Sequence, residues 1–411
     1  IKMNIVNRFL KYVSFPTTSN PNSRTHPSSS EQKLLAAYLV KELQALGVSD
    51  AYMDDYSYVY GTVKSNSSKP IETIGFIAHL DTSCDMSGEN IKPRLVHNYD
   101  GGDVVLNEAL NIVMTTKEFP FLRELKGRTL IVTDGTTLLG ADDKAGIAEI
   151  MTMVEYFHKH PEVEHGDIKI AFTPDEEIGE GPLFFNIEAW QAKWAYTVDS
   201  MKEGLINYEN FNAAAARVVI SGINMHPGYA KNHMKNSLLI AMEYNQMLPV
   251  AMTPSHTENY EGFYHLNNIE GNVERTEMHY IIRNHDKLKF ANQKAQMEKI
   301  AAYLNDVYGE KTVSVEIHDQ YLNMKELVEK HPDALNVAIE AIKQAGVELT
   351  ILPIRGGTDG AQLTYRGLVC PNLGTGSYNF HSRYEFVTVE GMEKCTEILI
   401  NIVKIVANKS N

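Results

Sequence analysis

The sequence predicts an α/β fold with a mostly parallel sheet, interrupted by a smaller α+β domain. At 411 residues the chain is longer than the ~250–300 residues at which a single core stops growing. Strand and helix patterns alternate in the first half of the chain and again near its end, and a different pattern lies between them. We therefore expect one α/β domain formed by residues 3–208 and 321–411, with residues 209–320 inserted into it.

The first part of the α/β domain begins with a predicted helix. Ser29 followed by Gln32 has the pattern of a capping box, and leucines at helical spacing continue to about Gly47. The apolar, β-branched run at 71–78 predicts a buried strand. The elements expected next are a strand at 129–133, a helix at 144–160, a strand at 168–173, a helix at 184–193 and a strand at 195–198. This alternation is typical of a parallel sheet with both faces covered.

The pattern changes after residue 199, where several strands accompany two helices. The expected elements are a strand at 217–221, a helix at 235–248, strands near 272 and at 278–283, a helix at 290–308 and a strand at 312–317. About 110 residues with this content form a small α+β domain. Alternation resumes with a helix from residue 326, a strand at 349–354 and a helix at 392–406.

Composition limits the partners and the compartment. The chain has 38 Lys and Arg against 52 Asp and Glu, a net charge of −14, which disfavours nucleic acid and anionic membrane surfaces. Its 3 cysteines are too few and too scattered for a disulfide framework, which fits a reducing cytoplasm. No apolar stretch has the length of a membrane span. We expect a cytoplasmic protein with neither nucleic acid nor membrane as a partner.

A first candidate site lies at the end of the strand 71–78. His79 and Asp81 are two residues apart, so in extended backbone they face the same side. The carboxylate of Asp81 could hold one ring nitrogen of His79 while the other nitrogen faces a metal. The alternative is a histidine that is merely satisfied by a nearby acid.

Further candidates follow the other predicted strands. Asp142 precedes a predicted helix, Glu176 and Glu177 follow the strand 168–173, and Asp199 ends a strand. Each has a structural alternative, which is a helix cap, a solvated acidic loop and a turn-forming aspartate, respectively. His381 lies in a glycine-rich loop, where a histidine is usually just exposed.

Their joint position favours a metal site over these alternatives. Each follows, or lies in a loop expected to follow, a strand of the same sheet, so they could converge on one edge. Two histidines and three carboxylates suit a pair of divalent ions with one carboxylate bridging. Glu176 is next to a ligand but directed elsewhere by the alternation of extended chain, so it could accept the proton of a metal-activated water.

These motifs resemble the M20 family of dinuclear zinc peptidases. The resemblance rests on segments 79–83, 140–144, 175–179 and 198–200 and on His381, and it extends from Met3 to the final helix. Segments 139–146, 222–228 and 371–376 are similar to the tripeptide aminopeptidases of that family. The resemblance implies a zinc-peptidase catalytic domain interrupted by an α+β lid, two Zn²⁺ per chain and a small peptide substrate. A homodimer through the lid is a further expectation.

The resemblance also assigns roles to residues of the catalytic domain. His79 and Asp199 would bind one zinc, Glu177 and His381 the other, and Asp142 would bridge them. Asp81 would orient His79, and Glu176 would be the general base and acid. It further implies a cis peptide bond between Asp142 and Asp143. Cys84 matches no ligand position and is expected to be a small buried residue.

Three residues outside this set would bind substrate. His226 matches a histidine that supports the oxyanion, although a His-Pro-Gly turn could be ordinary loop. Arg283 and Arg355 match positions that hold a substrate carboxylate, although each alone could be a solvated cation. The activity implied is removal of the N-terminal residue from tripeptides. The alternatives are another M20-type amidohydrolase (carboxypeptidase, dipeptidase or deacylase), a catalytically silent metal-binding protein, or a dinuclear phosphoesterase.

Overall fold

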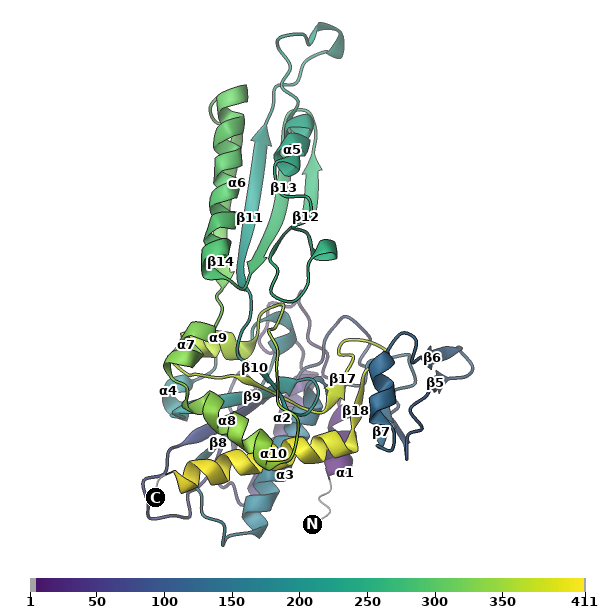
Figure 1. Cartoon of the computed structure of the whole chain (residues 1–411), viewed down its shortest axis with the longest axis vertical. Helices are drawn as coiled ribbons and strands as arrows, with labels where there is room; N and C mark the ends of the chain where they lie inside the picture. Colours follow the sequence, from purple (N-terminus) through teal and green to yellow (C-terminus); the bar gives the residue numbers. More distant parts are fainter. Residues whose placement is uncertain (1–4, 410–411) are drawn as a thin grey trace. The chain divides into compact units, whose positions relative to one another are not determined.

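The computed structural model describes residues 5–409, which divide into two compact units (Figure 1). Unit 1 contains the chain up to Tyr208, Glu326–Leu352 and the chain from Gln362 onward, and unit 2 contains Glu209–Lys325 and Pro353–Ala361. Residues 353–361, which the sequence analysis assigned to the α/β domain, thus lie in unit 2. The predicted domain ends at residues 3 and 411 lie outside the described residues, and the domain bounds remain a prediction.

Unit 1 contains a central sheet of eight strands in the order β1-β2-β8-β3-β9-β16-β10-β15. These strands are β1 Tyr52–Met53, β2 Val59–Val63, β8 Ile168–Thr173, β3 Ile74–His79, β9 Trp194–Ser200, β16 Asn372–Gly374, β10 Leu205–Asn207 and β15 Thr350–Ile351. The pairs from β8 to β16 are parallel, as is β10 with β15, and the others are antiparallel. The predicted α/β class with a mostly parallel sheet is confirmed.

Helices cover both faces of this sheet. Successive side chains of a strand point to opposite faces, and those of β3 and β9 are buried on both sides. On one face Ile77 and Ala195 belong to a cluster with Trp190 and Leu363. On the other face the Tyr196 hydroxyl donates to the backbone of α8 at 2.6 Å. The helices are α1 Ile5–Val13, α2 Glu31–Ala45, α3 Ala141–Lys159, α4 Ile187–Trp190, α7 Lys325–Lys330, α8 Asp333–Gln344, α9 Asp359–Tyr365 and α10 Val389–Asn408.

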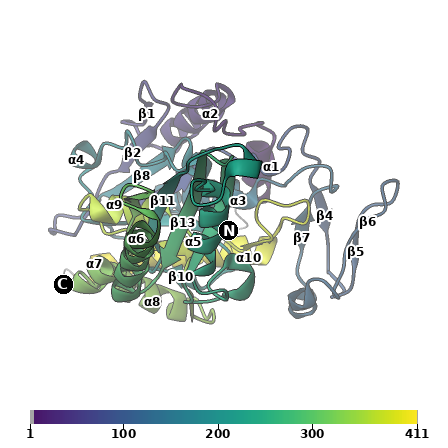
Figure 2. The same ribbon diagram turned by 90° about the horizontal axis from the view of Figure 1, so that it is seen from above.

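A second sheet of unit 1 lies beside the first (Figure 2). It is antiparallel, with the order β17 Ser377–Tyr378, β18 Phe386–Thr388, β7 Leu130–Val132 and β4 Arg94–Val96, and the hairpin of β5 Val104–Asn107 and β6 Ile112–Met114 accompanies it. The strand predicted at 129–133 is β7, so its placement in the parallel sheet was wrong. Leu130 and Val132 pack with Leu122 and Phe386 in a separate core, which holds this strand apart.

Unit 2 is an antiparallel sheet of four strands packed with two helices. The order is β12 Phe263–Gly271, β13 Arg275–Asn284, β11 Asn212–Ser221 and β14 Val313–Tyr321, with α5 Ser237–Gln246 and α6 Lys287–Tyr308. Burial alternates along β13, so Met278, Tyr280 and Ile282 enter a core with residues such as Ile240 and Leu304. Side chains between them face away from this core.

Two local predictions were wrong for identifiable reasons. The capping box does not form, because α2 begins after Ser30 without a side-chain cap. The Gln32 amide donates to the Ser29 hydroxyl at 3.0 Å and to Asp175 Oδ1 at 2.7 Å, and not to the backbone of the helix start. The helix predicted at 184–193 spans only Ile187–Trp190. It is short because Asn186 caps its start and Gln191 adopts a left-handed conformation at its end.

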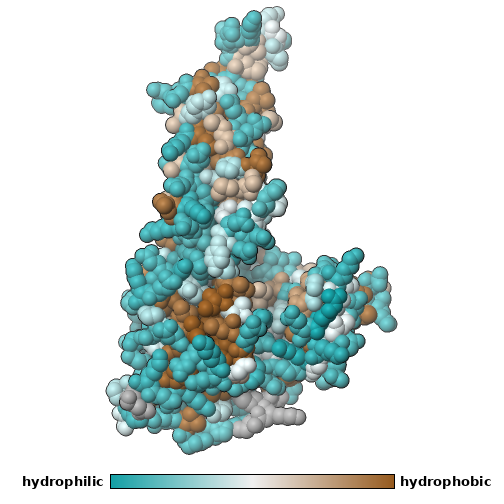
Figure 3. Space-filling view, in the orientation of Figure 1, coloured by the Kyte–Doolittle hydropathy of each residue, from teal (hydrophilic) through white to brown (hydrophobic). Residues whose placement is uncertain are grey.

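The surface is mostly hydrophilic on the face seen in Figure 3, with one broad area of hydrophobic residues on unit 1. Within residues 5–409, none of the helices combines the length and apolar character needed to cross a membrane.

Candidate metal centre

His79 stands at the end of β3 with its two ring nitrogens in different environments. Nε2 lies 2.9 Å from Asp142 Oδ1 and 3.2 Å from Asp199 Oδ1. Nδ1 lies 2.9 Å from the backbone oxygen of Asp81 and 3.2 Å from its carboxylate. The Asp81 side fixes the ring, and the other nitrogen faces a group of carboxylates, as in histidines that bind metals.

Asp142 lies between two imidazoles at the start of α3. Its Oδ1 faces His79, and its Oδ2 lies 2.9 Å from Nε2 of His381. The Asp142–Asp143 peptide bond is cis, as the resemblance implied. Gly146 brings this helix against β9, since a Cβ there would lie 2.1 Å from the backbone oxygen of Val198. One carboxylate is thus shared by both histidines.

Glu176 and Glu177 lie on one turn of 3-10 helix after β8, so the expected extended backbone with opposed side chains was wrong. Glu177 Oε2 lies 2.8 Å from Nε2 of His381, and Glu176 Oε2 lies 3.5 Å from Nε2 of His79. The turn is held by Asp81, whose two oxygens accept from the backbone N–H groups of Glu176 and Glu177 at 3.0 Å each. Both glutamates therefore face the same cluster.

His381 comes from the loop between β17 and β18, and not from the parallel sheet. Its Nδ1 lies 3.0 Å from Asp85 Oδ2. Asp85 thus contacts the Nδ1 atom of His381, as Asp81 contacts the Nδ1 atom of His79. The sequence analysis missed Asp85, which only its position shortly after Asp81 could have suggested.

The described residues of unit 1 thus bring together every predicted ligand and the predicted base. Asp142 and His381 reach the cluster from the neighbouring sheet, which corrects the expectation that all of them follow strands of one sheet. Asp143 was not predicted as a site residue, and it accepts from the backbone N–H of His79 at 3.0 Å. Its adjacency to Asp142 was the available signal.

Burial sets the protonation of the acids. It raises the pKa of Glu176 to about 7, helped by the charges of Asp142 and Asp81 and opposed by His79. It raises the pKa of Glu177 to about 11, together with the charge of Asp142. Burial, followed by the charge of Asp199, raises the pKa of Asp143 well above the ordinary range. Burial also raises the pKa of Asp199 well above its ordinary range, opposed by His79 and helped by Glu176 and Asp142. The protein's own groups therefore leave these acids short of positive charge.

The groups at the centre of the cluster shift toward their charged forms. Burial raises the pKa of Asp142, but hydrogen bonds from His381 and His79 outweigh it and bring the pKa well below the usual range. Hydrogen bonds to Asp142 and Glu177 raise the pKa of His381 to about 11. Burial lowers the pKa of His79, but Asp199, Glu176 and Asp142 together raise it well above its ordinary value. The Nε2 atoms of both rings thus face carboxylates at the positions from which they could bind metal ions.

The donor set fits divalent cations. Ligand atoms lie within 4.8 Å of one another in the groups His79–Glu176–Asp199, His79–Asp142–Glu177 and Asp142–Asp143–Asp199. Imidazole nitrogen and carboxylate oxygen are ligands that zinc accepts. Moreover, Asp143 Oδ1 is buried without a hydrogen-bond partner. Buried acids facing histidine nitrogens are costly without a compensating cation, so the cluster is suited to binding metal.

Two further buried titratable residues lie close to Asp142 in the fold or the chain, and one of them supports its backbone. Glu385 accepts hydrogen bonds from the backbone of residues 139–142. Lys144 is fully buried, donates to the backbone oxygen of Phe15 at 2.8 Å and has its pKa lowered to about 7 by burial. No sequence pattern singled out Glu385, because its partners lie more than 240 positions away in the chain.

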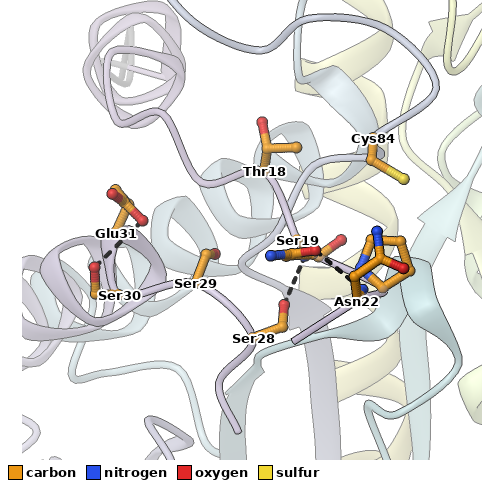
Figure 4. A pocket seen from close by; sticks show the side chains of 10 residues that line it. Thr18, Ser19, Asn22, Ser28, Ser29, Ser30, Glu31 and Cys84 are labelled. Carbon is orange, nitrogen blue, oxygen red and sulfur yellow. Dashed lines mark hydrogen bonds between the residues drawn. The ribbon is translucent and has the colours of Figure 1, made fainter. Parts of the chain in front are cut away.

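A polar pocket of about 690 Å³ opens beside the loop that follows β3 (Figure 4). Hydroxyl and amide groups from the segment before α2 line it, together with Cys84. Cys84 is exposed, so its expected burial was wrong. Its loop carries polar residues toward this opening and makes no apolar core for it to enter.

The three predicted substrate-binding residues lie in unit 2. His226 is exposed, and its Nδ1 accepts from the backbone N–H of Gly228 at 3.1 Å. Arg283 donates to the backbone oxygens of Ala214 and Ile282 and lies over the Tyr321 ring.

Arg355 has several partners within unit 2. It donates to the backbone oxygens of Asn259 and Glu261 and to the Thr257 hydroxyl, and it lies over the Phe211 ring. These contacts place Arg355 in the packing of its own unit, and a role in substrate binding stays a prediction.

Solved structures share this fold. Aminopeptidase PepT from Bacillus cereus aligns with a TM-score of 0.78 and 23% identity, covering 98% of this chain and 99% of that one. A tripeptidase from Staphylococcus aureus aligns with a TM-score of 0.76 and 21% identity, covering 99% of each chain. A dinuclear metal-binding peptidase of family M20 from Bacillus subtilis aligns with a TM-score of 0.64 and 14% identity, covering 98% of this chain and 97% of that one.

Sequence comparison adds the family. A peptidase T from Caldanaerobacter subterraneus is 53% identical over 405 residues, which are 98% of this chain and 99% of the relative. A peptidase T from a Geobacillus species is 51% identical over 410 residues, covering 100% of both chains. The model of peptidase family M20/M25/M40 matches residues 132–405, which include Asp142, both glutamates, Asp199 and His381. The chain belongs to peptidase family M20/M25/M40, whose members are metal-dependent peptidases.

Proposed function

We propose that the protein is a zinc-dependent aminopeptidase that removes the N-terminal residue from tripeptides. Full-length relatives named peptidase T, at about half identity, and the fold shared with a tripeptidase support the substrate class. The observation that carries the proposal is the Asp142 carboxylate between His79 and His381, with Glu176 beside it. This arrangement combines a bridging ligand with a candidate base.

In this proposal His79 and Asp199 would bind one zinc ion and Glu177 and His381 the second, and Asp142 would be a ligand of both. Two ions held in this way would lower the pKa of a bound water and polarise the scissile carbonyl. The dinuclear M20 peptidase of similar fold supports the number of ions. Asp81 positions the ring of His79 and the turn of the two glutamates.

Glu176 is the proposed general base and acid. Its side chain is 17% exposed and its Oε2 lies 3.5 Å from Nε2 of His79, so a water bound in the cluster would lie within its reach. Glu176 takes one proton from the attacking water and delivers it to the leaving amine nitrogen as the C–N bond breaks. The products are an amino acid and a dipeptide.

The substrate would also be bound by residues of unit 2. Because Nδ1 of His226 accepts a hydrogen bond, the neutral ring carries its hydrogen on Nε2 and could donate it to a developing oxyanion. A guanidinium suits the substrate's terminal carboxylate, and Arg283 is the preferred candidate because Arg355 already donates through both terminal nitrogens. We further propose a cytoplasmic location and a homodimer through unit 2.

A panel of peptides tests this function. Protein loaded with zinc is assayed on di-, tri- and tetrapeptides, on N-acetylated and C-amidated tripeptides, and its metal content is measured. We expect two zinc ions per chain and release of the N-terminal residue from free tripeptides. Preference for an acylated peptide, or release of the C-terminal residue, would instead indicate another amidohydrolase of the family.

The variant Glu176→Gln tests the mechanism on the same panel. We expect it to keep both metal ions and the fold but to lower turnover by about 10²–10⁴, the usual size of a general acid–base contribution. The matched control is Glu180→Gln, a nearby acid whose contact at 3.5 Å is to His26. Turnover within a few-fold of wild type in Glu176→Gln would rule out its role as the base.

A further inference from the structure

We infer that Glu385 is a positioning residue of the metal centre, whose carboxylate fixes the backbone that carries Asp142. The inference rests on the proposed metal site. It concerns a residue that does not touch the metal positions and acts through the main chain.

Glu385 is 1% exposed and accepts three backbone hydrogen bonds. Its Oε1 accepts from the N–H groups of Leu139 and Gly140 at 2.7 Å each, and its Oε2 accepts from Asp142 N–H at 3.0 Å. A carboxylate is a strong acceptor for such groups. Leu139 and Gly140 immediately precede α3 and Asp142 lies in its first turn, where backbone N–H groups have no acceptor within the helix.

The backbone at this point depends on outside support. Gly140 adopts a left-handed conformation with φ of 84°, and Asp142 has non-helical angles of φ −87° and ψ 96°. The regular hydrogen bonds of α3 therefore cannot determine where the Asp142 carboxylate points. The three bonds to Glu385 supply that constraint immediately around Asp142.

Glu385 also links this turn to the other histidine. It follows His381 by four residues, its backbone N–H donates to Ser382 at 3.2 Å, and the next residue begins β18. The side chains of His381 and Asp142 meet at 2.9 Å. The side chain of Glu385 therefore connects the loop that carries His381 to the backbone that carries Asp142. These two residues also contact each other directly through their side chains.

The same principle recurs around the cluster. Asp81, from the segment of His79, holds the backbone of Glu176 and Glu177. Asp143, next to Asp142, holds the backbone N–H of His79 at 3.0 Å. Each of these ligand segments is fixed by a carboxylate from a different ligand segment, and Glu385 serves the segment of Asp142. The recurrence favours a role in site geometry over a local role in folding.

The variant Glu385→Gln separates these roles. The amide oxygen can still accept from Leu139 and Gly140, but its NH₂ group meets the N–H of Asp142, so one bond becomes a contact between two donors. We expect zinc affinity, measured by competition with a chelator, to fall about 10- to 100-fold, the usual effect of losing an outer hydrogen-bond partner of a metal ligand. With saturating zinc, kcat should fall and KM should change little.

Glu390→Gln is the matched control, because Glu390 likewise accepts from a backbone N–H, that of Thr129 at 2.9 and 3.0 Å, outside the cluster. It should keep wild-type zinc affinity. Wild-type affinity in Glu385→Gln, or an equal loss in both variants, would overturn the inference. If Glu385→Gln does not fold, Glu385→Asp provides the test, since its shorter carboxylate should weaken zinc binding in a folded chain.

The affinity measurement also distinguishes this inference from the proposed activity. Loss of zinc affinity in Glu385→Gln alone supports the positioning role even if the wild type cleaves no tripeptide. Conversely, a wild type that cleaves tripeptides while both variants bind zinc equally well keeps the activity and rejects the role of Glu385.

Discussion

The metal centre of unit 1 and the charged face of the sheet in unit 2 treat acidic side chains in opposite ways. In unit 2, Glu277 receives hydrogen bonds from Arg217 and Arg275, which lower its pKa to about 2. In unit 1, burial and the charge of Asp142 raise the pKa of Glu177 to about 11. One acid is neutralised by protein cations at the surface, and the other is held beside more acids in the interior.

The difference indicates which cluster belongs to the fold and which to function. In unit 2 the arginines donate hydrogen bonds to Glu277 and balance its charge, so this acid requires no external cation. The acids of unit 1 share two imidazoles and retain an unpartnered oxygen on Asp143. A natural protein retains such a costly arrangement when an external cation completes it.

Metal removal should expose this difference most strongly. Chelated protein should lose all peptidase activity, and its stability should fall as pH rises from 5 to 9. The folded chain holds protons on Glu176, Glu177 and His381, whose pKa values are about 7, 11 and 11, more tightly than the unfolded chain does. Because the folded state then binds more protons than the unfolded state, raising the pH favours unfolding.

Thermal unfolding at several pH values, with chelator and with zinc, measures this effect. Zinc at about 100 times its Kd should raise the free energy of unfolding by about 2.7 kcal/mol, because it binds the folded chain and not the unfolded chain. A chelated protein as stable at pH 9 as at pH 5 would show that the acids are compensated without metal. Substituting Glu277 should leave the response to zinc unchanged.

The grouping of the proposed ligands was predictable from sequence because of their joint position, since each pattern alone had a structural alternative and His381 lies in an ordinary glycine-rich loop. His79 follows a continuous apolar strand, and Asp142 sits at a strand-to-helix junction, where polar groups collect in α/β folds. The assignment of strands to the two sheets was harder to predict from the sequence. Three-residue strands such as β7 carry little periodic signal, so the second sheet that delivers Asp142 and His381 was not anticipated.

The residues that hold the ligands were harder to predict. Glu385 and Asp85 act through partners distant in sequence, and neither has a spacing that indicates its role. The turn of Glu176 and Glu177 was predicted as extended because local sequence does not show that Asp81 binds both of its backbone N–H groups. Such information comes from tertiary contacts.

Glu149 extends the comparison to a buried acid outside the metal centre. It is 0% exposed on α3, and neither of its carboxylate oxygens has a hydrogen-bond partner. Burial, with the charge of Glu203, raises its pKa well above 4.5. As pH rises above about 4.5 the unfolded chain loses this proton and the folded chain keeps it, so stability falls by up to about 1.4 kcal/mol per pH unit.

The variant Glu149→Gln removes this dependence. Its stability relative to wild type should increase between pH 5 and 8 in urea unfolding. The control is Glu155→Gln on the same helix, where burial is outweighed by hydrogen bonds from Lys159 and Arg8 that lower the pKa. The free energy by which wild type is more stable than Glu155→Gln should stay constant above pH 5. An advantage of Glu149→Gln that does not grow with pH would contradict a protonated Glu149.

The smallest effect is expected for Glu277→Gln, on the charged face of unit 2. Its low pKa means that the ion pairs contribute stability above the ordinary glutamate pKa and lose it as pH falls toward 2. At neutral pH the guanidinium of Arg217 is 41% exposed, so solvent and salt screen the pair. Glu277→Gln should therefore lower the unfolding temperature slightly at low salt and not measurably in 1 M NaCl.

Glu316, 3.8 Å from Arg217 and 61% exposed, offers the control, and Glu316→Gln should have no effect at either salt concentration. A loss at Glu277 that persists in high salt would mean that this face is desolvated, and the contrast between a solvated surface network and an interior cluster suited to metal would no longer hold.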